Sequence, residues 1–453
     1  MAQIRLDSNA FRHNIQAISN ALKNALDSSA LDSSENLANA LKSTNLANAT
    51  KPPKLALVMK DNAYGHGLLQ IANLAKENNI DCVFVKNYAE ALQVQRFFAH
   101  ITVLYGGVPF DAPSNIYVSI ASLDSLKMLE KQAQNLDAKS IASKNPPLGI
   151  ELKCNIGMNR NGIQVSNFAQ KSTQQFAQDF AQKPAQILAQ KKDELDSALE
   201  ILKRLIKQNK ARLIGVFAHN GYGDNGGEKE QDFSTSQANF YAIKQRVALF
   251  CKNHKIPLPR FHSLSTTGAL RSALQASAKQ NNTSDFCPQH KLQNQPQNKL
   301  QDKQKSQEIP VLSDSLVRIG IGAYGYHTAE IALGIALKPV LSLWANKIST
   351  QTLQKGEKIG YGGATIVAKK SVFSTYDIGY GDGLFRLGAN MPRLHCASGE
   401  EILPVMSMDC FSCASQKDEI CVFDDVSEFA TVFGTIPYTI LTHLSPFIKR
   451  VIV

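Results

Sequence analysis

The stretch that decides the fold is Leu55-Ala56-Leu57-Val58-Met59-Lys60, followed at once by Asp61-Asn62-Ala63-Tyr64-Gly65-His66-Gly67. A run of five apolar residues bounded by Pro53 and by glycines is typical of a buried strand. A lysine at the carboxyl end of a parallel strand lies where catalytic residues gather in barrels. A partly desolvated amine there can lose its proton near neutral pH and form an imine with an aldehyde. The alternative is a strand-end lysine whose stem packs while its amine reaches water.

Strands and helices are expected to alternate along most of the chain. The expected strands are 55–59, 82–85, 101–105, 116–120, 149–154, 212–219, 260–264 and 316–321. The expected helices are 10–25, 68–77, 88–98, 124–134, 237–254 and 266–276. This alternation predicts an α/β protein with an N-terminal (β/α)8 barrel.

The pattern changes near residue 336, after which short strands separated by Gly-containing turns are expected at 341–348, 366–372, 376–378 and 402–406. We therefore assign residues 1–335 to the barrel and 336–453 to a C-terminal mostly-β domain. Three polar tracts near 26–50, 166–193 and 277–308 are predicted to be surface insertions. The second tract, rich in Ala and Gln, is equally compatible with a solvated helix.

The composition is that of an ordinary globular protein, with 453 residues, 43% hydrophobic and 19% charged. No signal-peptide segment or membrane-spanning run is present, so we predict a cytoplasmic protein without membrane association. The net charge of +11 comes from dispersed basic residues. This dispersal argues against nucleic-acid binding; attraction of an anionic cofactor and substrate is one interpretation, and compositional drift is another.

Two short motifs suggest functions that the rest of the sequence does not support. The eight cysteines are too dispersed for a disulfide scaffold, and the Cys410–Cys413 spacing lacks a second ligand pair, so no metal site is predicted. The segment 320–325 matches the dinucleotide pattern G-x-G-x-x-G. That pattern requires a following helix and an acidic residue about 20 positions later. Residues 337–349 offer neither, which argues against a nicotinamide cofactor.

Nine segments resemble alanine racemases in the order of that family. Residues 58–67 resemble its cofactor-lysine motif, and 153–162 resemble Lys-x-Asp-Thr-Gly-Met-x-Arg-x-Gly, with Asn155 and Ile156 in place of Asp and Thr. The other matching segments are 217–219, 262–266, 317–321, 360–365, 379–383, 408–409 and Tyr438. The resemblance covers nearly the whole chain outside the polar tracts, and it is to a fold-type III enzyme dependent on pyridoxal 5'-phosphate (PLP).

The resemblance implies a set of cofactor contacts. Lys60 would hold PLP as a Schiff base, and Arg318 would face the pyridine nitrogen, with His219 bridging Arg318 and a catalytic tyrosine. Arg160 would contact the cofactor phenolate and the substrate carboxylate. The phosphate would be bound by Tyr64, Thr266, Tyr438 and the backbone amides of Gly320 and Ile321. Because a guanidinium cannot accept a proton, Arg318 should leave the ring nitrogen unprotonated and limit carbanion delocalisation, which suits a racemase.

The resemblance also implies how the reaction proceeds. Racemisation at Cα needs an electron sink and one acid/base group on each face of the substrate. Lys60 would serve one face, for the proton of D-alanine. Tyr361 would serve the other, for the proton of L-alanine, and would come from the second subunit of a homodimer. Lys153, as a carbamate, would orient Arg160.

Tyr380, Met408 and Asp409 match the segments lining the substrate entrance. The expected function is the interconversion of L- and D-alanine, supplying D-alanine for peptidoglycan. Serine or other small amino acids remain possible substrates.

Two other classes of protein share parts of this pattern. Fold-type III decarboxylases have the barrel, the lysine and a β domain, but carry an acidic residue at the ring nitrogen, where this chain has Arg318. The single-domain PLP homeostasis protein, a carrier without turnover, lacks the β domain and therefore any counterpart of Tyr361.

Overall fold

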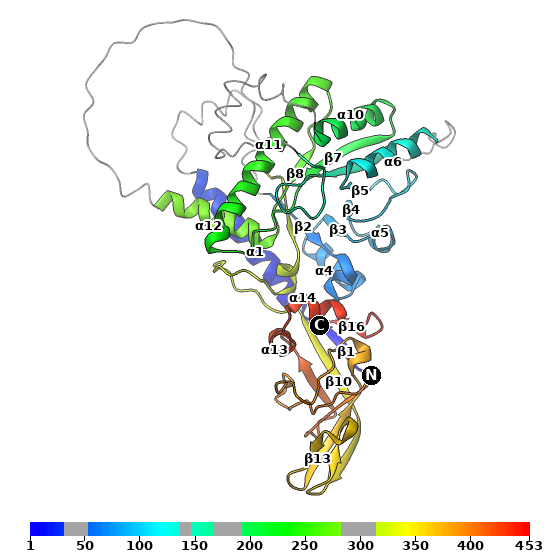
Figure 1. Ribbon diagram of the computed structural model, residues 1–453, viewed down its shortest axis with the longest axis vertical. Coiled ribbons are helices and arrows are strands. Elements are labelled where there is room, and N and C mark those ends of the chain that lie inside the picture. The colour runs from blue at the N-terminus through cyan, green and yellow to red at the C-terminus, as the bar shows by residue number, and fades with distance from the viewer. Residues whose placement is uncertain (31–52, 136–145, 166–192, 282–313) are drawn as a thin grey trace, which may run out of the picture.

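The computed structural model describes residues 1–30, 53–135, 146–165, 193–281 and 314–453. The described chain forms a parallel barrel with outer helices and an elongated, mostly-β part below it (Figure 1). Most of the predicted polar insertions lies outside the described residues. Of their ends, residues 26–30 belong to helix α1 (Ser8–Ala30) and 277–281 to helix α12 (Thr266–Asn281).

The predicted barrel is confirmed. Eight parallel strands pair in the order β8 (Arg260–His262), β7 (Ala211–Phe217), β6 (Leu148–Lys153), β5 (Ile116–Ile120), β4 (His100–Val103), β3 (Cys82–Val85), β2 (Lys54–Val58) and β9 (Leu316–Ile319). The two end strands then meet. Ser265 and Arg318 form a parallel bridge, and the N–H of Arg318 donates to the carbonyl of Leu264 at 3.2 Å. These contacts close the sheet, so the strand ends converge on one face of the barrel.

Helices surround this barrel (Figure 1). Besides α1 and α12, they are α4 (Leu68–Glu77), α5 (Tyr88–Val94), α6 (Leu123–Gln134), α10 (Glu194–Lys207) and α11 (Glu230–His254). The bounds of α4 are those predicted. Helix α10 was not predicted, although Asp193 and Asp196 form a capping box at its start and its apolar face is buried. Among the helices of the described ranges, none is long and apolar enough to cross a membrane.

The C-terminal part is mostly β, as predicted. Its main sheet runs β14 (Phe411–Cys413), β13 (Ser371–Tyr376), β10 (Leu341–Leu353), β1 (Gln3–Leu6), β16 (Lys449–Ile452), with β15 (Glu419–Phe423) also on β10. A hairpin of β11 (Lys358–Ile359) and β12 (Thr365–Ile366) and helices α13 (Ser427–Val432) and α14 (Pro437–His443) complete it. Strand β1, from the other end of the chain, pairs with both β10 and β16. The assignment of residues 1–335 and 336–453 to two domains stays a prediction.

Three strand predictions in this part were wrong. The expected strands 366–372 and 376–378 are replaced by β12, a bend at 368–370, and β13, which ends at Tyr376. The expected strand 402–406 contains Pro404, which cannot donate to a ladder. Its buried Ile402 and Met406 instead donate backbone hydrogen bonds to two separate loop residues, Leu394 and Leu387. The alternating apolar residues of segment 402–406 are therefore buried in the core from a loop and do not form one face of a strand.

Candidate active site

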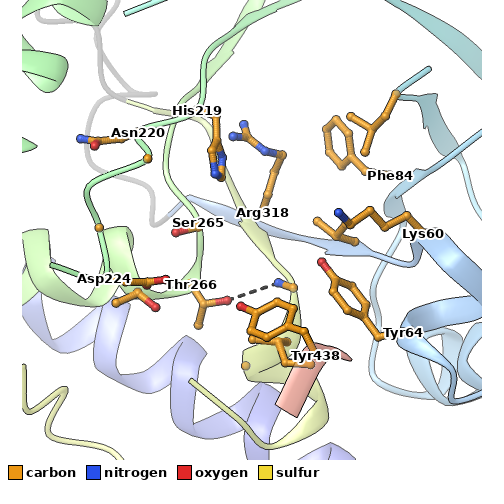
Figure 2. A pocket seen from close by; sticks show the side chains of 18 of the residues that line it. Lys60, Tyr64, Phe84, His219, Asn220, Asp224, Ser265, Thr266, Arg318 and Tyr438 are labelled. Carbon is orange, nitrogen blue, oxygen red and sulfur yellow. Dashed lines mark hydrogen bonds between the residues drawn. The ribbon is translucent and has the colours of Figure 1, made fainter. Parts of the chain in front are cut away.

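A cavity of about 230 Å³ opens at the carboxyl ends of the barrel strands. Its lining includes Lys153 and all nine predicted cofactor contacts, some of which are labelled in Figure 2. The nine contacts are Lys60, Tyr64, Arg160, His219, Thr266, Arg318, Gly320, Ile321 and Tyr438. These side chains come from both halves of the barrel and from α14. The fold therefore brings together residues that are up to 378 positions apart in the sequence, from Lys60 to Tyr438.

Lys60 is held at the start of a left-handed turn, which the sequence did not indicate. Asp61, Asn62, Ala63 and Tyr64 all have positive φ angles, between 52° and 55°. For L-residues this conformation costs about 1–2 kcal/mol each, so surrounding contacts must fix it. The Asn62 side chain accepts from the N–H of Leu68 at 2.8 Å, and the Lys86 ammonium donates to Asp61 at 2.6 Å.

One end of the cavity is suited to a phosphate group. The hydroxyl of Tyr64 would lie 2.9 Å from a Cβ at Gly320, and the N–H of Gly320 donates to Thr266 at 3.3 Å. The Tyr64 and Tyr438 rings meet edge-on at 5.9 Å (Figure 2). Burial raises the pKa of both phenols, that of Tyr438 to about 12. Both hydroxyls therefore keep their protons and can donate to an anion.

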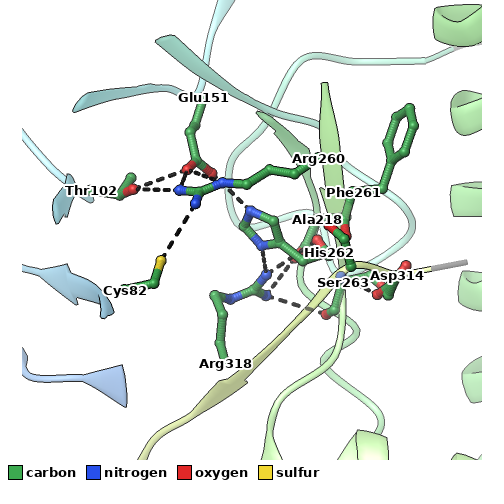
Figure 3. A network of polar contacts seen from close by, with 11 residues as sticks. Cys82, Thr102, Glu151, Ala218, Arg260, Phe261, His262, Ser263, Asp314 and Arg318 are labelled. Carbon is green, nitrogen blue, oxygen red and sulfur yellow. Dashed lines mark hydrogen bonds and ion pairs between the residues drawn. The ribbon is translucent and has the colours of Figure 1, made fainter. Parts of the chain in front are cut away.

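Arg318 is fixed by a buried polar network (Figure 3). It donates to the carbonyl of Ala218 at 2.7 Å and to Nδ1 of His262, whose Nε2 lies 2.8 Å from Glu151. Burial lowers the pKa of His262 to about 4, although Glu151 opposes this shift. A neutral His262 that donates from Nε2 to the carboxylate leaves Nδ1 free to accept from Arg318. Arg260 also donates to Glu151. The carboxylate therefore lies between the Arg260 guanidinium and His262, which in turn accepts from Arg318.

The role of His219 as a bridge between Arg318 and a catalytic tyrosine stays a prediction. Among the described residues, Arg318 donates to His262 and to the backbone carbonyls of Ala218 and Ser263, and it makes no hydrogen bond to His219. His219 lines the cavity beside Arg318, and burial together with the Arg318 charge lowers its pKa to about 3. The sequence predicts no role for His262 and does not single out Glu151 or Arg260. Arg260 lies two residues before His262 on β8, and Glu151 reaches both from β6 over Gly215 of β7.

Lys153 lies among positive charges. Burial, followed by the charges of Arg160, Arg318 and Lys60, lowers the pKa of Lys153 to about 8. Its amine donates to Asn161 at 2.5 Å. Asn155, which stands where the resemblance had suggested Asp, accepts from the N–H groups of Gly157 and Asn159 and so shapes the loop before Arg160.

Comparison with known proteins identifies the family. Residues 34–185 match the alanine racemase N-terminal domain and residues 340–452 the alanine racemase C-terminal domain. An alanine racemase from Campylobacter curvus is 30% identical over 450 residues, which cover 99% of each chain. The chain belongs to the alanine racemase family.

Solved structures of alanine racemases have the same fold. That from Clostridium difficile 630 aligns over 100% of this chain and 95% of its own with a TM-score of 0.68 at 18% identity. That from Bartonella henselae, with covalently bound pyridoxal phosphate, aligns over 100% and 99% with a TM-score of 0.60 at 18% identity.

Four predicted residues of this alanine racemase family member lie outside the cavity lining. Tyr361, on the turn between β11 and β12, is 70% exposed. Tyr380, Met408 and Asp409 are also exposed. The N–H of Gly381, the residue after Tyr380, donates to the Met408 carbonyl at 2.8 Å, which ties the two segments together. The cavity of one chain thus contains the predicted lysine but not the predicted tyrosine base.

The lowered pKa of Lys153 predicts a pH-dependent stability. In cofactor-free protein in CO2-depleted buffer, Lys153→Met should be more stable than the parent below pH 8, because the substitution removes a charged amine from a cluster of cations. Between about 8 and the ordinary value of 10.5, the folded state releases its proton before the unfolded state, so the parent gains stability as pH rises. The advantage of the variant should therefore shrink over this range. Denaturant titrations at several pH values would measure it, and a pH-independent difference would contradict the charge argument.

Proposed function

We propose that this chain, an isomerase by its family, interconverts L-alanine and D-alanine with PLP and supplies D-alanine for peptidoglycan. The observation that carries the proposal is the pairing of Lys60 with Arg318 across one cavity. A decarboxylase of this fold type would have a carboxylate where Arg318 stands. Burial lowers the pKa of Arg318 only to about 10, so the guanidinium remains charged at neutral pH and does not act as a proton donor to the ring nitrogen.

The lining of the cavity fits PLP. Four cationic side chains, Lys60, Lys153, Arg160 and Arg318, face a space that ends in hydroxyl and amide donors. A Cβ at Gly322 would lie 2.6 Å from Cγ2 of Thr266, so glycine keeps this end open. Such a donor set suits a group with an anionic phosphate and a phenolate. When bound, PLP would supply a sink for the electron pair left at the substrate Cα.

The residues of the chain would then divide the remaining work. Lys60 would attach the cofactor, and Tyr64, Thr266, Tyr438 and the amides of Gly320 and Ile321 would hold its phosphate. Arg318 would face the ring nitrogen, with His219 beside it. Arg160 would hold the substrate carboxylate and so orient Cα between the two bases, which matters because small misplacements are costly in rate.

Protons would move on two faces of the substrate. The amine of Lys60 would exchange a proton with D-alanine, and Tyr361 of the partner subunit would do so with L-alanine. The 70% exposure of Tyr361 in its own chain supports its delivery to a second copy. Tyr380, Met408 and Asp409 would line the entrance to the substrate site. The active unit would be a homodimer.

Removing the lysine tests the proposed attachment. Lys60→Ala should lower racemisation of either enantiomer at least about a hundredfold, the usual scale of an acid/base group. Chiral chromatography of incubations with L- or D-alanine and PLP would measure this loss, and parallel incubations with serine would define substrate breadth. The control is Lys54→Ala, at the exposed opposite end of β2. A variant that still retains the cofactor covalently after borohydride reduction would rule out Lys60 as the attachment residue.

Mixed dimers test the shared site. Co-expression of Lys60→Ala with Tyr361→Phe gives heterodimers in which one site has both bases and the other has neither. Random pairing should therefore restore about a quarter of the parent activity in a two-fold symmetric dimer. Each variant alone should remain nearly inactive. Verified heterodimers that show no gain in activity would contradict a site built from two chains.

Lys153 would act as a carbamate. Its lowered pKa, about 8, leaves a neutral fraction that can attack CO2, forming an N–C bond and releasing one proton. The product would accept hydrogen bonds from Arg160, whereas the protonated amine repels it. Spectra of enzyme in 13C-bicarbonate should show a carbamate carbon that disappears in Lys153→Met, and small carboxylates should partly restore the activity of that variant. A fully active enzyme with an unmodified, protonated Lys153 would contradict this role.

A further inference from the structure

Arg450 links the C-terminal β structure to the turn that carries Lys60. It lies on β16, is 9% exposed, and donates from Nε to the carbonyl of Gly65 at 2.9 Å. Its other N–H groups donate to the carbonyls of Ser445 at 3.0 Å and Ile448 at 2.6 Å. Among the described residues, the hydrogen-bond acceptors of Arg450 are all backbone carbonyls, and none is a carboxylate. A buried charge held in this way depends on keeping these hydrogen bonds.

The two glycines of Gly65-His66-Gly67 lie directly against this C-terminal structure. Both have positive φ angles, of 81° and 100°. A Cβ at Gly65 would overlap the carbonyl oxygen of Leu441 in α14, and one at Gly67 would lie 2.6 Å from Cδ of Arg450. The glycines thus let the C-terminal structure approach the turn closely, which places β16 beside α4 and α14 (Figure 1).

His66, between the glycines, reinforces the same contact. It is fully buried, and its Nδ1 lies 3.0 Å from the carbonyl of Tyr64. Burial lowers the pKa of His66 to about 4. The imidazole is therefore neutral at physiological pH and adds no positive charge beside the Arg450 guanidinium.

The position of Arg450 is set by the β sheet rather than by the barrel. Arg450 is paired with Ile4 in the parallel ladder of β16 and β1, and β1 pairs in turn with β10. The hydrogen bond to Gly65 acts on the residue that directly follows the strained segment 61–64. Without an outside contact, a segment that costs several kcal/mol to hold would relax toward right-handed or extended backbone.

We propose that Arg450 is a positioning residue, which holds the left-handed turn through Gly65 so that Lys60 and Tyr64 face the cavity together. The roles of Lys60 and Tyr64 in this inference rest on the proposed function, but the effect of Arg450 on the turn does not. A displacement of β16 would then be transmitted through the Arg450 side chain to the turn that carries Lys60.

Hydrogen exchange in the cofactor-free protein tests the structural part. The amides of Gly65, His66 and Gly67 donate to the carbonyls of Asp61, Ala63 and Asn62. In Arg450→Met these three amides should exchange about tenfold faster or more, since a charge-assisted hydrogen bond is lost. Arg450→Lys should fall between this variant and the parent. The matched control is Lys449→Met, which removes the same charge from the adjacent exposed residue. Amides of β10 should be unaffected in all variants, which would show that the sheet remains folded.

PLP affinity and the split between kcat and KM test the functional part. Arg450→Met should weaken PLP binding about tenfold, because the apparent affinity falls in proportion to the fraction of molecules in which the turn presents Lys60 and Tyr64 together. It should lower kcat more than it changes the KM for alanine, and Arg450→Lys should recover part of both losses. Unchanged exchange at residues 65–67, or equal acceleration in Lys449→Met, would overturn the proposal. Faster exchange with normal PLP affinity would overturn it as well. A parent protein that binds no PLP would instead contradict the proposed function, and the exchange result would still decide the role of Arg450 in the turn.

Discussion

The left-handed turn from Asp61 to Tyr64 is the constraint on which the site depends. It joins the end of β2 to α4 and directs Lys60 and Tyr64 into one cavity, with the lysine amine 5.8 Å from the centroid of the tyrosine ring. Because none of its four residues is glycine, its conformation must be imposed from outside. The barrel does so through Lys86, which donates to Asp61, and through the N–H of Leu68, which donates to Asn62; the C-terminal structure does so through Arg450.

Charge is the second constraint. Lys60, Lys153, Arg160 and Arg318 face the same cavity. Asp224, the one carboxylate among the described residues of its lining, accepts from Thr328 at 2.8 Å. The cavity therefore favours an anionic ligand. Beneath it, Glu151 is buried; burial would raise the pKa of that carboxyl, but Arg260 and His262 outweigh burial and lower it. The ionised Glu151 and neutral His262 together keep Arg318 in place as a hydrogen-bond donor that holds its proton.

The parts of the fold that could be predicted from sequence are those set by local pattern. The barrel followed from buried strands alternating with helices, and α4 has the predicted bounds, between Gly67 and Asn78. Motif resemblance selected residues that do line one cavity, although their roles stay predictions. The missed features depend on contacts distant in sequence. Strand β1 is four residues long and needs β10 and β16 as partners. Glu151 on β6 meets Arg260 on β8, which lies beyond the intervening strand β7 and 109 positions away in the sequence.

Racemisation by two bases on opposite faces is the central claim, and isotope incorporation during the first turnovers tests it most directly. The cofactor-loaded enzyme would be given L-alanine in D2O, and both enantiomers would be separated at low conversion and examined at Cα. If one group removes the proton and a different, solvent-equilibrated group returns one, the new D-alanine should carry deuterium while the remaining L-alanine gains little. The reverse should hold from D-alanine. D-alanine that retains the original proton, or equal labelling of both enantiomers from the outset, would indicate a single base and contradict the account.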